Sequence, residues 1–206
     1  MKGINMKPLA SISLLGLLLF TLSSCRKSNP VNSSSGQQMW PLQVGNTWVM
    51  RWDRLDTSGN VLSSGYDTTL VTGDTLISGN TWYHVSWGGI STDLMINKSD
   101  GVYNMSNGTA QPTWKYPAKV GDQYVLLAGS HYMNIQSTDT SLTVPEGIYS
   151  CYEYRDFQVA DNLPTEVDFL SPGVGPVQTE VYGFVGTSSN RLFCSERLRL
   201  VSFTLK

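Results

Sequence analysis

Few residues of this chain are spaced for catalysis or metal binding. The two histidines, His84 and His131, have no Cys, second His or carboxylate at the spacing of a zinc site. No Gly-x-Ser-x-Gly segment places a serine on a nucleophile elbow. A carboxylate pair could in principle hydrolyse a glycoside, but the candidates lie at expected strand ends and on polar faces, where solvated acids are common: Glu153, Asp156, Glu166, Asp168 and Glu180. The sequence therefore predicts no enzyme, no metal and no cofactor.

Aromatic side chains are the better candidates for a binding site, because the chain contains six Trp and ten Tyr. Alternation in an extended strand puts Trp48, Met50 and Trp52 on one face, and Tyr83 and Trp87 on one face of a later strand. These five side chains could line a cavity for an apolar ligand, or the tryptophans could stack on sugar rings. Ordinary packing in a hydrophobic core is the alternative for the same residues.

The elements that position these residues are predicted to be strands. From Met39 onward no window of eleven or more residues keeps apolar side chains at helical spacing. Short alternating runs are separated by turn segments such as 57–60, 78–80 and 100–101. We expect an all-β fold, a strongly curved antiparallel meander of about ten strands that forms a half-barrel or an open barrel.

One phrase occurs twice, as PLQVGNTWV at 41–49 and PAKVGDQYV at 117–125. A glycine cradle for phosphate would need a helix after it, and neither copy has one. Proline before a strand and a Val-Gly-[Asn/Asp] bend instead predict a strand-starting turn that is used twice. By the same reasoning SPGVG at 171–175 is predicted to be a tight hairpin and not a nucleotide site.

The first residues have the layout of a secretory signal, with two lysines, an apolar run at 9–22 and small residues after it. Leu22-Ser23-Ser24-Cys25 resembles a bacterial lipobox, which implies cleavage before Cys25 and lipid on its thiol. We therefore expect a signal peptide at 1–24, a lipid-anchored flexible tether at 25–38 and a single β-sheet domain at 39–206. Arg26 stands where an inner-membrane retention signal would have Asp, so the anchor is expected in the outer membrane, with the periplasmic leaflet favoured.

Three phrases together resemble a widespread family of small bacterial lipoproteins. They are WPLQVGNTW at 40–48, VPEGIY at 144–149 and SPGVGPV at 171–177. The resemblance implies a curved antiparallel sheet similar to the half-barrels that carry lipoproteins, and it supplies no catalytic residue. Pro176 departs from the family pattern, in which an aliphatic residue is more usual.

The mature chain is expected to keep two cysteines, Cys151 and Cys194, because lipid would occupy Cys25. An oxidising compartment and an even remainder suggest a disulfide between them. Two buried and unpaired thiols are the alternative. The sequence does not show whether the two Cα atoms lie within the roughly 7 Å that a bridge allows, so both remain open.

The formal net charge of −2, without a basic stripe, argues against a nucleic-acid partner. The expected partner is the membrane, through the anchor at Cys25, and the oligomeric state is not indicated. Two functions are compatible with these features. One is a non-catalytic envelope lipoprotein that binds an apolar ligand or an envelope partner in the concave face of its sheet. The other is a surface lipoprotein that binds glycans with exposed aromatics.

Overall fold

The computed structural model describes residues 37–126, 129–185 and 191–206. The expected signal peptide, Cys25 and most of the tether lie outside these ranges. The described residues contain no helix and twelve strands. The strands are β1 (Thr47–Leu55), β2 (Val61–Ile77), β3 (Asn80–Trp87), β4 (Ser91–Lys98), β5 (Gly101–Ser106), β6 (Thr109–Lys115), β7 (Gln123–Leu126), β8 (His131–Val144), β9 (Gly147–Gln158), β10 (Leu163–Ser171), β11 (Gly175–Val185) and β12 (Arg191–Thr204).

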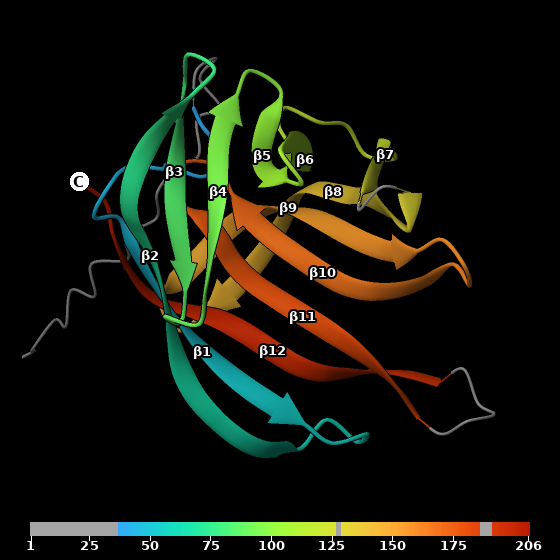
Figure 1. Cartoon of the computed structure of the whole chain (residues 1–206). Coiled ribbons are helices and arrows are strands. Elements are labelled where there is room, and N and C mark those ends of the chain that lie inside the picture. Colours follow the sequence, from blue (N-terminus) through green and yellow to red (C-terminus); the bar gives the residue numbers. More distant parts are fainter. Residues whose placement is uncertain (1–36, 127–128, 186–190) are drawn as a thin grey trace, which may run out of the picture.

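All twelve strands form one antiparallel sheet that curls into a nearly closed barrel (Figure 1). The strand order is β6-β5-β4-β3-β2-β1-β12-β11-β10-β9-β8-β7. Each strand follows its sequence neighbour except at one place, where β1 pairs with β12 and leaves β6 and β7 as the two edges. The prediction of a strongly curved antiparallel sheet is confirmed, with twelve strands in place of about ten.

The first copy of the repeated phrase forms the turn that enters β1. Gly45 has a φ of 90°, and its N–H donates to the Val71 carbonyl at 2.8 Å. The Asn46 N–H donates to the Gln43 carbonyl at 3.0 Å, and the Asn46 carbonyl accepts from the Val71 N–H at 3.0 Å. The phrase therefore bends the chain and ties the bend to β2.

The second copy makes the same three bonds at the entrance to β7. Gly121 has a φ of 88°, and its N–H donates to the Ile135 carbonyl at 2.8 Å. The Asp122 N–H donates to the Lys119 carbonyl at 3.0 Å, and the Asp122 carbonyl accepts from the Ile135 N–H at 3.0 Å. The prediction of a strand-starting turn is confirmed. Each copy opens a run of six strands, β1–β6 and β7–β12.

Trp40, in the segment before β1, lies at the centre of the core and is fully buried. Its ring centroid lies 5.3 Å from that of Trp48, 5.5 Å from Trp87 and 5.7 Å from Trp114. Its ring also covers Gly175 so closely that a Cβ there would overlap it. Trp40 therefore joins β1, β3, β6 and the β10–β11 hairpin.

The SPGVG segment forms the predicted hairpin between β10 and β11. Gly173 and Gly175 have φ values of 78° and 93°, which only glycine adopts readily. The segment before β1 and the start of β1 both bind this hairpin directly. The Gly173 N–H donates to the Gln38 carbonyl at 2.8 Å, and the Trp48 Nε1–H donates to the Val174 carbonyl at 2.6 Å. The phrases at 40–48 and 171–177, two of the three that resemble the lipoprotein family, are thus in contact.

Tyrosine side chains bridge the open seam between β6 and β7. The Tyr124 hydroxyl donates to the Thr113 carbonyl at 2.7 Å and accepts from the Lys115 N–H at 3.3 Å. The Tyr154 hydroxyl, on β9, donates to the Lys115 carbonyl at 2.7 Å. These bonds satisfy backbone groups of β6 that lack a strand partner on this side.

We predict that Trp40→Ala lowers the free energy of unfolding by about 3–5 kcal/mol, as for other buried aromatics. Chemical denaturation measures the change. Trp52→Ala is the control, because Trp52 is only half-buried, and its loss should be clearly smaller. Equal losses for the two variants would contradict the central place of Trp40.

We predict that Gly121→Ala costs about 1–2 kcal/mol, the penalty for an L-residue in the left-handed region. A Cβ at 121 meets nothing within 4 Å, so the change isolates the backbone cost. Gly73→Ala, at a strand position without a positive φ, should be neutral or slightly stabilising. A neutral Gly121→Ala would show that the repeated turn does not require this conformation.

Candidate ligand-binding site

A cavity of about 290 Å³ opens on the concave face of the sheet beside the Trp40 cluster. Most of its lining is apolar, and the polar lining comes mainly from Asp67, Thr69 and Thr179. The apolar lining residues are Trp48, Met50, Trp87, Pro176 and Leu198, with Gly88, Ile90 and Ser91 at the rim. The site therefore combines residues from both runs of strands.

Strand alternation directs the floor of the cavity inward. Trp48 and Met50 on β1 lie opposite Thr69 and Asp67 on β2, so these four side chains share the concave face. On the other side of β1 the pairing shifts between Val49 and Met50. This bulge shifts the pairing by one residue, so that Leu198 lies opposite Trp52. The side chain of Leu198 therefore lies on the concave face.

The rim is a glycine turn between β3 and β4. Gly88 and Gly89 have φ values of 56° and 72°. The Gly88 N–H donates to the Thr68 carbonyl at 3.0 Å, which ties the turn to β2. Ile90 follows with 91% of its surface exposed. An exposed aliphatic side chain at the mouth of an apolar cavity can close over an apolar group that enters it.

Three of the five side chains predicted to line a ligand site, Trp48, Met50 and Trp87, line this cavity. The other two do not. Trp52 is half-buried and lies over Gly65, its partner on β2. Of the two alternatives for the stripe Trp48, Met50 and Trp52, burial in the core holds for Trp48 and Met50 but not for Trp52. Tyr83 pairs with Met95 and packs against the core.

Sequence reasoning missed the lining residues Ile90, Pro176 and Leu198. Ile90 lies in a turn, where alternation gives no signal. Leu198 and Pro176 come from β12 and β11, and their position beside β1 depends on the pairing of the first and last strands. The one sequence signal for these lining residues was Pro176, which departs from the pattern of the lipoprotein family that the chain resembles.

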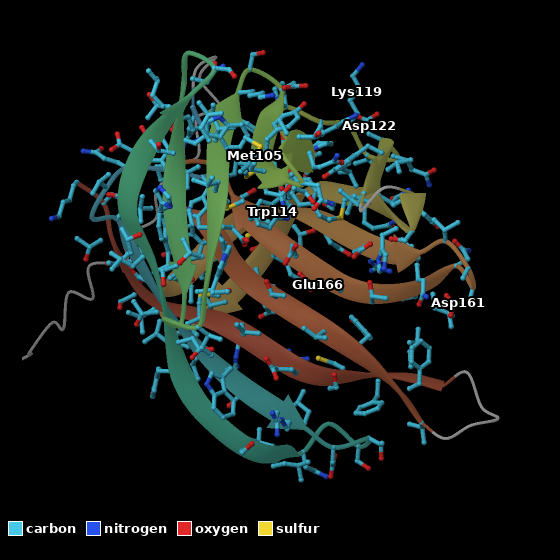
Figure 2. All side chains as sticks on the ribbon, viewed as in Figure 1. Met105, Trp114, Lys119, Asp122, Asp161 and Glu166 are labelled. Atoms are coloured by element: carbon cyan, nitrogen blue, oxygen red, sulfur yellow. The ribbon has the colours of Figure 1, made fainter. Side chains whose placement is uncertain are left out.

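A second hollow, of about 180 Å³, is acidic. Asp156, Glu166 and Asp168 line it, together with Trp114 from the opposite side of the seam. Figure 2 labels Trp114 and Glu166. Asp168 is only 6% exposed. Its carboxylate accepts hydrogen bonds from the Trp114 Nε1–H at 2.9 Å and the Thr179 hydroxyl at 2.7 Å.

The two carboxyls on β10, Glu166 and Asp168, both have raised pKa values. The negative charge of Asp168 and burial raise the pKa of Glu166 well above its usual value. Burial also raises the pKa of Asp168, but donors from Thr179 and Trp114 oppose that shift by stabilising the anion. Glu166 is therefore the carboxyl of this pair that ionises less readily.

The other acidic candidates are engaged in polar contacts. Glu153 pairs with Arg155 at 2.8 Å, and Glu180 pairs with Arg197 at 2.9 Å. Glu166 and Asp168 both line the acidic hollow, and each changes the pKa of the other. Asp156 lies 3.1 Å from the Nδ1 atom of His131.

Within the described ranges, no group of three or more His, Cys, Asp and Glu side chains could hold a metal ion. In the same ranges, no helix is both long and apolar enough to cross a membrane.

Cys151 and Cys194 are both free, so the structure has the unpaired alternative and not the disulfide. Cys151 lies on β9 and Cys194 on β12, with β10 and β11 between them. Three strand spacings amount to about 14 Å, beyond the reach of a bridge. Burial raises the pKa of Cys151 to about 12, whereas Cys194 is only half-buried.

No protein-family model matches this chain, and no characterised protein matches its sequence. Two solved structures resemble it. A Bacteroides fragilis protein, assigned as exported and with a YmcC-like fold, is 12% identical with a TM-score of 0.41, over 82% of this chain and 100% of that chain. A Parabacteroides distasonis protein, assigned as a lipoprotein, is 14% identical with a TM-score of 0.38, over 82% of this chain and 99% of that chain. Similarity at this level does not transfer function.

We predict that Glu166→Gln changes how stability depends on pH. The folded state raises the pKa of Glu166, so its contribution is complete below the unfolded pKa, about 4.3, and is lost as the pH rises through the folded pKa. The glutamine variant should therefore gain stability relative to wild type as the pH rises. Asp74→Asn, at an exposed carboxylate, is the control. Parallel stability curves for Glu166→Gln and wild type between pH 4 and 8 would contradict the raised pKa of Glu166.

Proposed function

We propose that this chain is a lipid-anchored lipoprotein of the cell envelope that performs no catalysis and binds an apolar ligand, or an apolar group of an envelope partner, in its concave face. The cavity floored by Trp48, Met50 and Leu198 carries this proposal. Its volume of about 290 Å³ is near the lower end for ligand pockets. It suits one bulky side chain or a short stretch of acyl chain.

The exposure of the tryptophans favours an apolar ligand over a glycan. Stacking on a surface glycan requires exposed aromatic faces. Four of the six tryptophans, Trp40, Trp48, Trp82 and Trp114, are buried. Trp52 and Trp87 are half-buried. The glycan-binding alternative therefore has less support.

The proposed anchor is lipid on Cys25, and the proposed location is the periplasmic leaflet of the outer membrane. The lipobox-like 22–25 segment and the absence of Asp after the cysteine support this assignment. The described chain begins at Gln37, whose Nε2 donates to the Pro172 carbonyl at 2.8 Å. The sheet domain thus starts within 12 residues of Cys25, which keeps it close to the membrane surface.

Ser91→Trp should block the cavity, because Ser91 is exposed at its rim. We expect N-phenyl-1-naphthylamine, an apolar dye, to bind the wild-type protein saturably with increased fluorescence, and Ser91→Trp to weaken binding about tenfold or more, a change of about 1.4 kcal/mol. Thr92→Trp is the matched control, since the next residue on β4 points to the opposite face. Unsaturable dye binding, or equal effects of the two variants, would refute this site.

Mass spectrometry of the mature N-terminus tests the anchor. We expect cleavage before Cys25 and acyl chains on that residue, which together make release from the membrane negligible. Cys25→Ser should accumulate as an uncleaved precursor. An unmodified terminus at any other residue would disprove the assignment.

A further inference from the structure

Strand β2 is longer than the strand beside it. It pairs with β1 over Val61–Leu70. Its pairing with β3 begins only at Thr69, opposite Trp87. Within the described ranges, residues 61–67 therefore pair with a strand on one side only, with Gly88 of the β3–β4 turn beside Asp67. In Figure 1 this part of β2 continues next to β1 beyond the ends of β3 and β4.

The backbone of this segment is ready to pair with another strand. The Thr68 carbonyl already points away from β1, because it accepts the Gly88 N–H at 3.0 Å. Backbone groups alternate along a strand, so Ser64 and Tyr66 direct their N–H and C=O groups to the same side. No described residue forms a backbone ladder with that side.

This edge lacks lysine, proline and, among the described residues, a covering strand, three of the features that usually prevent strand addition. Natural edges carry lysine or proline, or are covered by other elements. The segment VLSSGYD at 61–67 contains neither residue. Leu62 and Tyr66 are 65% and 66% exposed. An open edge of this length is therefore available to a partner strand.

The edge leads directly into the apolar cavity. Asp67 and Thr69 both line it, and Trp87, which pairs with Thr69, forms part of its wall. A partner strand could pair with β2 along the line that β3 follows up to Trp87, which lies opposite Thr69. Its first side chain on the concave face would then lie opposite Asp67, in the mouth of the cavity. The following inward side chain would lie opposite Gly65, next to the Trp52 indole that covers this glycine.

Charge indicates which side chains such a strand carries. Asp67 is the one charged residue that lines the cavity. It is exposed, and no ion pair to it exists among the described residues. A basic side chain two positions from the apolar one would lie over Trp52, where it can meet both the indole face and the Asp67 carboxylate.

We propose that an extended peptide segment of a partner protein adds to β2 along Val61–Asp67, with one apolar side chain in the cavity and a basic side chain beside it. This inference rests on the proposed function, because the same cavity receives the apolar group, and it names the ligand as a polypeptide strand. Backbone pairing supplies the general affinity, and the cavity and Asp67 select the sequence.

A palindromic peptide, acetyl-Thr-Lys-Thr-X-Thr-Lys-Thr-amide, tests the proposal without presuming strand direction. X is Leu, Phe or Asp. We expect the Leu and Phe peptides to protect the Ser64 and Tyr66 amides from hydrogen exchange and to shift the Trp52 and Trp87 indole resonances. The Asp peptide should bind about tenfold more weakly or worse.

Two variants at one position separate backbone pairing from side-chain contacts. Tyr66→Pro removes only an N–H that faces the open edge, a position where proline is tolerated in a strand, and should weaken peptide binding about tenfold or more. Tyr66→Ala keeps that N–H and should retain binding within about threefold. Both variants should bind N-phenyl-1-naphthylamine like wild type, which shows that they are folded and that the cavity is intact.

The outcomes distinguish this inference from the proposed function. If the dye binds and no peptide protects Ser64 and Tyr66, strand addition is wrong and the apolar site stands. If neither the dye nor a peptide binds, both proposals fail. Protection of these amides without peptide that increases with protein concentration would show a second copy of this chain on the edge and overturn the inference.

Discussion

The packing of Trp40 against Gly175 is the contact on which the rest of the structure depends. It brings a segment that precedes the first strand onto the hairpin between β10 and β11. The Trp48 Nε1–H and the Gln38 carbonyl bind the same hairpin. Because Trp40 also meets Trp87 and Trp114, one side chain connects both runs of six strands. Glycine at 175 is needed for its backbone conformation and for this close approach.

A large curved sheet with a single open seam has to fill its interior or leave it available for binding. Trp40 and the tyrosines at the β6–β7 seam fill much of it. The apolar cavity and the acidic hollow adjoin each other, because Asp168, which lines the hollow, accepts a hydrogen bond from Thr179, which lines the cavity. The acidic hollow raises the pKa of Glu166, whereas the apolar cavity opens beside an unpaired strand edge. We therefore propose binding at the apolar cavity.

Local features of the sequence predict most of the strands and turns, because Gly-containing turns and alternation act over a few residues. The bend at Gly45 and Gly121 and the hairpin at Gly173 are examples. Non-local pairing is not encoded in such patterns. The pairing of β1 with β12 places Leu198 and Pro176 beside Met50. The two free cysteines are separated by β10 and β11 because β9 to β12 pair in chain order. Alternation identifies the face of Trp52 but not how much of its side chain is buried.

Native mass spectrometry of the mature protein, purified from its own envelope beside the Ser91→Trp variant, tests most directly whether the concave cavity binds an apolar partner. The wild-type protein should carry a non-covalent mass in addition to its anchor, and the variant should carry much less of it. A wild-type protein without any bound mass, or an equal bound mass on both proteins, would contradict binding in this cavity.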